Sequence, residues 1–219
     1  MIKAIAIDGP SASGKSTIAK MLAKKLKMNY LDTGAMYRAI TLYVLNKGID
    51  PEDEGAVNGI LSEIDLSVVN NRVILNGEDV TGLIRTDAID KAVSPVSSFG
   101  PVRKMLVAMQ RKIGKETSVI LDGRDIGTVV LPDAALKIFL TASPEVRAQR
   151  RMDDRKSSSN MNFDQMLEAV KRRDYLDSHR EISPLKPADD AIILDSSDMG
   201  LDEVVAEIEN LWKERQCTQ

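Results

Sequence analysis

The chain has 219 residues, of which 43% are hydrophobic and 29% charged, an ordinary balance for a globular protein with a sizeable core. Its formal net charge of −3 provides no basic field for a nucleic acid, and its apolar runs are too short for a signal peptide or a membrane span. The single cysteine, Cys217, and the single histidine, His179, argue against disulfides, zinc clusters and Ser-His-Asp chemistry. We therefore expect a cytoplasmic protein without a nucleic-acid or membrane partner.

The first predicted elements are a short apolar strand at residues 2–8, a glycine-rich loop and a helix. The loop fits the pattern G-x-x-x-x-G-K-[ST] and consists of Gly9, Pro10, Ser11, Ala12, Ser13, Gly14, Lys15, Ser16 and Thr17. Between a strand and a helix, such a loop directs backbone N–H groups and the helix N-terminus at an anion. Lys15 would reach the outer phosphates, and the Ser16 hydroxyl would bind Mg²⁺. A glycine- and serine-rich turn before an ordinary helix fits this context less well, so the loop predicts a nucleoside triphosphate site.

The next segments predict a strand at residues 28–31, a helix at about 34–47 with Thr33 as its N-cap, and a further helix after Pro51. Three short segments that we interpret as strands follow, at residues 66–69, 72–75 and 78–80. They are separated by Asn70-Asn71 and Asn76-Gly77, two-residue links that favour type I′ turns. Because an antiparallel meander cannot belong to a parallel sheet joined by helical crossovers, we interpret it as an insert.

The rest of the chain again alternates helices and strands. The pattern predicts strands at residues 118–122, 136–140 and 191–195, and helices at about 87–97, 101–115, 144–155, 163–180 and from about 201. The predicted fold is therefore an α/β fold of the P-loop type, a doubly wound five-stranded parallel sheet with helices on both faces. We interpret residues 1–219 as one domain, with a core at about 1–62 and 98–219, the insert at about 63–97 and a short lid at about 151–162.

Three arginines lie where a second phosphate-bearing substrate would need them, near strand ends or near the polar segment 156–160. Arg38 lies one turn into the helix after Thr33, Arg124 follows a strand, and Arg173 lies on the helix after the polar segment. A solvated surface role is the alternative for each of them.

A stripe of arginines precedes the polar segment, with Arg147, Arg151 and Arg155 spaced i, i+4, i+8 along one helix face. Closure of such a segment would exclude water and place cations on a transferring phosphoryl group. The alternative is a solvated helix surface, with pairing to Glu145, Asp153 and Asp154.

Asp122 ends an apolar strand, as the Walker-B carboxylate does, and could hold Mg²⁺ directly or through water. An ordinary aspartate that starts a turn is the alternative. A GTPase is disfavoured, because Asn46–Asp50 departs from N-K-x-D by one place and the D-x-x-G match at Asp79–Gly82 lies in the insert.

Four stretches together resemble the bacterial cytidylate kinase family, and the resemblance covers essentially the whole chain. They are Asp8–Ser11, Leu31–Arg38, Asp122–Thr128 and Arg147–Arg151, of which the second and third are the most specific. The resemblance implies transfer of the γ-phosphoryl group of ATP to CMP or dCMP with Mg²⁺, by a cytoplasmic monomer. It also implies that the insert enlarges the region that binds the monophosphate.

The resemblance implies roles for individual residues. Arg38, Arg124 and Arg173 would hold the CMP phosphate, and Thr33, which stands where the family often has serine, would also bind the substrate. Ser94, Arg103 and Asp125 would contact the cytosine edge, and Asp177 the ribose hydroxyls. Lys15, Arg124, Arg151 and Arg155 would stabilise the transferring phosphoryl group, while Ser16 and Asp122 would bind the metal.

Two other functions remain as alternatives to a cytidylate kinase. A kinase of the same fold for shikimate or UMP would lack a reason for the insert and for the set Ser94, Arg103 and Asp125. A nucleotide-dependent switch or binding protein would use the phosphate loop only for occupancy, and its ATP turnover would not depend on a small acceptor.

Overall fold

Five parallel strands form the central sheet in the computed structural model, which describes residues 2–154 and 161–217. The strands are β1 (Ala4–Asp8), β2 (Asn29–Asp32), β6 (Val119–Gly123), β7 (Leu136–Thr141) and β8 (Ile192–Asp195). Their order is β2-β6-β1-β7-β8, and every pairing is parallel. The order reverses on either side of β1, so the loop after β1 lies at the switch point, where ligands bind in doubly wound sheets.

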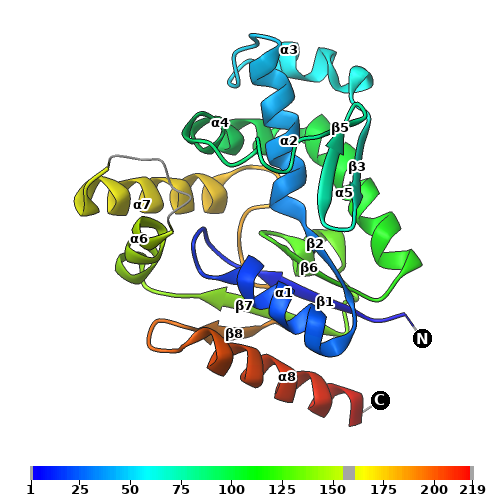
Figure 1. The fold of residues 1–219 in the computed structure, drawn as a ribbon, viewed down its shortest axis with the longest axis vertical. Coiled ribbons are helices and arrows are strands. Elements are labelled where there is room, and N and C mark those ends of the chain that lie inside the picture. Colours follow the sequence, from blue (N-terminus) through cyan, green and yellow to red (C-terminus); the bar gives the residue numbers. More distant parts are fainter. Residues whose placement is uncertain (1, 155–160, 218–219) are drawn as a thin grey trace.

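Helices cover both faces of the sheet (Figure 1). The helices α1 (Lys15–Leu26) and α8 (Leu201–Cys217) lie on one face, and α2 (Thr33–Asn46) and α5 (Gly100–Glu116) lie on the other. Side chains of a strand alternate between the two faces, so Ile5 and Ile7 pack with α1 and α8 whereas Ala6 packs with α2. The predicted fold class is confirmed.

The three-stranded insert is confirmed as well. It consists of β3 (Leu66–Val69), β4 (Arg72–Leu75) and β5 (Glu78–Asp79), all antiparallel. The linking residues Asn70, Asn71, Asn76 and Gly77 have φ values of 50°, 63°, 49° and 85°. Positive φ at both central positions is what a type I′ turn requires. The buried face of the insert packs onto the core beneath α2.

The remaining helices stand at the carboxyl edge of the sheet or beyond it. They are α3 (Glu54–Gly59), α4 (Asp87–Ser98), α6 (Pro144–Asp153) and α7 (Phe163–His179), with a 3₁₀ turn η1 (Leu61–Glu63) and a π-helical turn η2 (Ile126–Val130). The helix predicted after Pro51 is divided into α3 and η1, because α3 ends at Gly59, a residue that helices disfavour. Within the described part of the chain, no helix is long and apolar enough to cross a membrane.

The predicted N-cap of α2 was wrong by one residue. Asp32 has the extended backbone of a cap, and its carboxylate accepts a hydrogen bond from the Ala35 N–H at 2.9 Å. Thr33 is already helical, and its hydroxyl instead donates to the carbonyl oxygen of Asp122 at 2.7 Å. The Thr33 side chain therefore ties α2 to the end of β6.

Candidate active site

The loop after β1 has the backbone of a phosphate-binding loop. Gly9 adopts φ +148°, and a Cβ there would lie 2.0 Å from the carbonyl oxygen of Leu140, so only glycine fits. Ala12 and Gly14 are left-handed, with φ of 61° and 91°. Gly14 is the N-cap of α1 and has no side chain to occupy the first N–H groups of the helix. These groups and the helix dipole form an anion-binding site.

Lys15 is buried within this loop. Its Nζ donates to the Pro10 carbonyl at 2.5 Å and to Ser13 Oγ at 3.2 Å, which holds the ammonium group above the loop. Burial, together with the nearby Arg124, lowers the pKa of Lys15 to about 7. An anionic phosphate in the loop would favour the charged form and return this pKa toward its usual range.

The predicted metal ligands lie in direct contact. Ser16 Oγ donates to Asp122 Oδ2 at 2.8 Å, and the Tyr30 hydroxyl donates to Asp122 Oδ1 at 2.8 Å. Burial and the proximity of Asp32 raise the pKa of Asp122 to about 6, well above the usual range of an aspartate. Sequence reasoning missed Tyr30, which stands two residues before Asp32 and therefore points to the same face of β2.

Asp8, the last residue of β1, connects the phosphate loop with the turn that carries Asp125. Its carboxylate accepts the backbone N–H groups of Ile126 at 2.8 Å and Gly127 at 2.7 Å. Burial, reinforced by the negative charge of Asp125, raises the pKa of Asp8 to about 6. Its place immediately before Gly9 was visible in the sequence, but the N–H groups that it binds lie 118 and 119 residues away.

Two of the three residues predicted to contact the base form a buried ion pair. Arg103 on α5 contacts Asp125 through Nη2 and donates through Nη1 to the Ser97 carbonyl at 3.0 Å. The side chains of Arg103 and Asp125 are only 3% and 6% exposed, so each charge depends on the other. Arg180, which sequence reasoning missed, lies 3.7 Å from the second Asp125 oxygen.

A signal for Arg180 was present in the sequence. Arg173, Asp177 and Arg180 are spaced i, i+4, i+7, which places them on one face of a helix. The helix was predicted to include Arg180, whereas α7 ends at His179 and Arg180 has an extended backbone. Its guanidinium donates to the Ser183 carbonyl at 2.6 Å, which holds the side chain beside Asp125.

Arg124 and Asp177, predicted to bind the phosphate and the ribose, also contact each other. Arg124 Nε donates to Asp177 Oδ2 at 2.8 Å. Burial would lower the pKa of Arg124, but the attraction of Asp177 outweighs it and raises that pKa. For Asp177, burial is likewise outweighed by Arg124 and Arg173, so its pKa is lowered. The pair is fully ionised at neutral pH.

The predicted arginine stripe of α6 divides into two kinds of residue. Arg147 is 3% exposed, donates to the carbonyl groups of Ala142 and Ser11, and pairs with Asp174 at 2.6 Å. It therefore anchors α6 to the phosphate loop and does not belong to a solvated face. Arg151 contacts Asp90 on α4, and Arg155 lies outside the described residues, as does the central part of the predicted lid.

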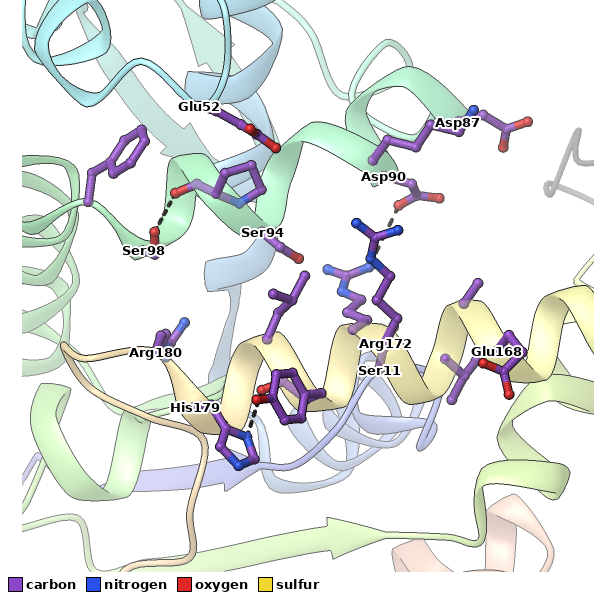
Figure 2. A pocket seen from close by; sticks show the side chains of 18 of the residues that line it. Ser11, Glu52, Asp87, Asp90, Ser94, Ser98, Glu168, Arg172, His179 and Arg180 are labelled. Carbon is purple, nitrogen blue, oxygen red and sulfur yellow. Dashed lines mark hydrogen bonds and ion pairs between the residues drawn. The ribbon is translucent and has the colours of Figure 1, made fainter.

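A cavity of about 1200 Å³ lies between α4 and α7 (Figure 2). Its walls include Ser11 of the phosphate loop, Asp90 and Ser94 of α4, Arg151, Arg173 and Arg180. The cavity thus reaches from the phosphate loop to the buried Arg103–Asp125–Arg180 cluster. Its size suits a nucleotide-sized molecule, and its cations suit a phosphate.

A phosphate loop at the switch point and an arginine-rich cavity beside it define a P-loop phosphotransferase, because the loop and the cavity meet at the same sheet edge. The family model described as "Cytidylate kinase" matches residues 5–214. The chain belongs to the cytidylate kinase family.

Curated relatives agree with this assignment. The chain is 50% identical to the cytidylate kinase of Bacillus pumilus over 209 residues, which cover 93% of each chain. It is 49% identical to the cytidylate kinase of Mycobacterium leprae over 213 residues, 96% of each chain. The solved structure of an uncharacterized protein from Eubacterium ventriosum has a TM-score of 0.52 at 16% identity, covering 98% of this chain and 99% of that one, and shows the same fold.

Proposed function

We propose that the protein is a cytidylate kinase, which transfers the γ-phosphoryl group of ATP to CMP or dCMP and yields ADP with CDP or dCDP. The observation that carries the proposal is the family match over residues 5–214, in a chain whose phosphate loop opens beside a cation-lined cavity. The loop Gly9–Thr17 would hold the phosphates of ATP, and the cavity would hold the acceptor nucleotide.

The metal would be magnesium, bound by Ser16 and Asp122. Both side chains offer hard oxygen atoms, and they lie 2.8 Å apart beside the phosphate loop. Mg²⁺ prefers one or two protein oxygens together with substrate phosphates and water, so a pair of this kind fits it. The ion would neutralise charge on the phosphates of ATP.

The acceptor phosphate would be bound by Arg38, Arg124 and Arg173, with Thr33 at the edge of that site. Arginine suits this role because its planar fork can bind two phosphate oxygens at once. The three guanidiniums come from α2, from the turn after β6 and from α7, so a phosphate would link three parts of the fold.

The base would be read by Ser94, Arg103 and Asp125, with Asp177 on the ribose hydroxyls. Cytosine offers one amine donor and two acceptors, which a carboxylate and two donors can satisfy. Uracil would present its O4 oxygen to the same carboxylate and leave a polar group unpaired, at a cost of about 1–3 kcal/mol. The buried Arg103–Asp125 pair supports this assignment, since it fixes the orientation of the carboxylate.

Catalysis would rest on position and charge rather than on a general base. Lys15, Arg124 and Arg151 would stabilise the transferring phosphoryl group during in-line attack, and Arg155 is proposed for the same role. Closure by a lid at about residues 151–162 would exclude water and so prevent hydrolysis of ATP. We further propose that one monomer suffices, with the core at about 1–62 and 98–219 and the insert at about 63–97 enlarging the acceptor site.

The test is a coupled assay of ADP release with Mg·ATP against CMP, dCMP, UMP, AMP and shikimate, with a control that lacks an acceptor. We expect strong release with CMP and dCMP only. Release that is equal with every acceptor and with none would contradict the proposal and indicate a nucleotide-dependent binding or switch protein.

A further inference from the structure

Asp90, a residue without an assigned role in the proposed reaction, lies where three arginines meet. It belongs to the first turn of α4, and its carboxylate faces the cavity, as Figure 2 shows. One oxygen contacts Arg38 of α2, the other contacts Arg151 of α6, and Arg173 of α7 lies 3.8 Å from the first. A single carboxylate therefore connects four helices.

The charges at this point do not balance. Burial would raise the pKa of Asp90, but the attraction of Arg38 and Arg151 outweighs it and lowers that pKa, so the carboxylate is ionised. Three guanidiniums face Asp90, and Arg173 also lies near the Arg124–Asp177 pair. Two carboxylates against four guanidiniums leave two positive charges in a half-buried place. Such an excess is unfavourable unless a further anion joins it.

Arg173 is the arginine of the three with the weakest contact to Asp90. Burial and the neighbouring Arg124 lower the pKa of Arg173 to about 10. Its Nε is buried and, among the described residues, no hydrogen-bond partner lies within reach. A buried guanidinium donor without a partner indicates a site that is completed by an anion.

The acceptor phosphate and Asp90 would compete for the same place. A phosphate that binds both Arg38 and Arg173 has to lie between their guanidiniums, where the Asp90 oxygen that faces both of them lies. A phosphate monoester carries about −1.5 to −2 charges at pH 7, against one for a carboxylate, and offers three acceptor oxygens. A dianion can thus displace Asp90, whereas a monoanion gains little by doing so.

We propose that Asp90 is an internal counter-ion that the acceptor phosphate must displace, and that it thereby makes the acceptor site selective for dianionic phosphate monoesters. The proposal rests on the proposed function for the identity of the acceptor, but the competition itself concerns only Asp90, the arginines and a phosphate. Asp90 is a specificity-determining and positioning residue, because it holds the three arginines together until a stronger anion binds.

The experiment is calorimetric titration of the purified protein with inorganic phosphate, CMP and acetate. Asp90→Asn preserves the size of the side chain and removes the competing charge. We expect this variant to bind phosphate and CMP about ten times more tightly than the wild-type protein, and to bind acetate measurably. Asp90→Glu restores the charge and should restore weak binding, which a purely structural role would not predict.

The matched control is Asp87→Asn, which removes one charge from the same turn of α4. Among the described residues, Asp87 forms no ion pair with an arginine, so a general change of potential would affect both variants equally. Unchanged or weaker phosphate binding by Asp90→Asn, or an equal gain in Asp87→Asn, would overturn the proposal.

A second measurement uses the wild-type protein, in case Asp90→Asn does not fold. The carboxyl ¹³C resonance of Asp90, assigned by its absence from Asp90→Glu, should shift on addition of phosphate or CMP, and a resonance that stays in place would overturn the proposal. Failure of the proposed function is a separate result, because it would appear as absent CMP-dependent ADP release while the titrations with inorganic phosphate still report on Asp90.

Discussion

The phosphate loop and the arginine-lined cavity lie side by side, but they are built in opposite ways. The loop is nine consecutive residues, Gly9–Thr17, whose anion-binding groups are mainly backbone N–H groups fixed by glycine conformations. The cavity is lined mainly by side chains of α4, α6 and α7, together with Ser11 of the phosphate loop and Arg180. Buried arginines around it already face carboxylates, in the pairs Arg38–Asp90, Arg103–Asp125 and Arg124–Asp177.

This difference follows from the physics of burial. A backbone N–H group is a neutral dipole, so a preformed loop of such groups is tolerated without a counter-ion. A guanidinium cannot lose its charge, and burying it without a partner costs several kcal/mol. A site made of buried arginines therefore needs internal anions, and a substrate that binds there must exchange with them. The donor side would be ready for its ligand, whereas the acceptor side would have to rearrange.

The largest effect is expected at the donor side, from Lys15→Ala. Because Lys15 is buried at the loop and its cation would face the transferring phosphates, we expect kcat/KM to fall by about 10³-fold. The measurement is CMP-dependent ADP release, and Lys24→Ala, an exposed lysine of the same helix, is the control. Turnover close to that of the control would contradict the role of the loop.

The link between the two sides can be tested through the pH dependence of stability. The pKa of Asp8 is about 6 in the folded protein, against an ordinary value of 3.8, which we take for the unfolded chain. Between pH 3.8 and pH 6, the folded state therefore binds the proton more tightly than the unfolded state does. The stability that this proton contributes is present below pH 4 and is lost as the pH rises through 6, a change of about 3 kcal/mol.

The measurement for Asp8 is urea unfolding of the wild type and of Asp8→Asn at several pH values. From pH 4 to pH 7, the free energy of unfolding of the wild type should fall by about 3 kcal/mol relative to that of Asp8→Asn. If the free energies of unfolding of the two proteins change with pH in parallel, the Asp8 carboxylate titrates normally and the prediction is contradicted.

The acceptor side can be tested at Asp125, the carboxylate that we propose contacts the base. Asp125→Asn replaces an acceptor by an amide that can donate to the O4 oxygen of uracil, so the ratio of kcat/KM for CMP to that for UMP should fall about 10–100-fold. The control is Asp133→Asn, an exposed residue before β7, and thermal unfolding checks that the buried Arg103 still has an adequate partner. Equal losses for CMP and UMP would mean that Asp125 does not read the base.

The smallest effect distinguishes two neighbouring arginines of α6. Arg150 donates to the hydroxyl and the carbonyl of the buried Ser196, at 3.1 Å and 2.6 Å, and so connects α6 to the end of β8. We expect Arg150→Ala to lower the free energy of unfolding by about 1 kcal/mol without changing kcat. Gln149→Ala, on the exposed side of the same turn, is the control, and a loss of kcat in Arg150→Ala would place it in the catalytic machinery.

Features that depend on local pattern could be predicted from the sequence. The strands, the Asn-rich turns of the insert and the phosphate loop each arise from residues within one short segment. The N-cap of α2 was missed by one residue because aspartate and threonine are both common N-cap residues and stand side by side at positions 32 and 33.

The sequence could not predict which charges meet. Nothing in the sequence around Asp90 distinguished it from a solvated aspartate. Its partners Arg38 and Arg151 lie 52 residues before it and 61 residues after it. Arg147 belonged to the same helical stripe as Arg151, but one turns toward the phosphate loop and the other toward α4. These pairings depend on how α4, α6 and α7 pack against one another, which no spacing in the chain encodes.

The most direct test of the contrast between the two sides is a crystal structure with CMP and a non-hydrolysable ATP analogue. The backbone of Gly9–Thr17 should superpose on its present positions within about 1 Å, as expected for a preformed site. Arg38 and Arg173 should contact the CMP phosphate, with Asp90 more than about 4 Å from Arg38, beyond the range of an ion pair. A bound CMP phosphate that leaves the Arg38–Asp90 pair intact would contradict the exchange of internal anions for substrate.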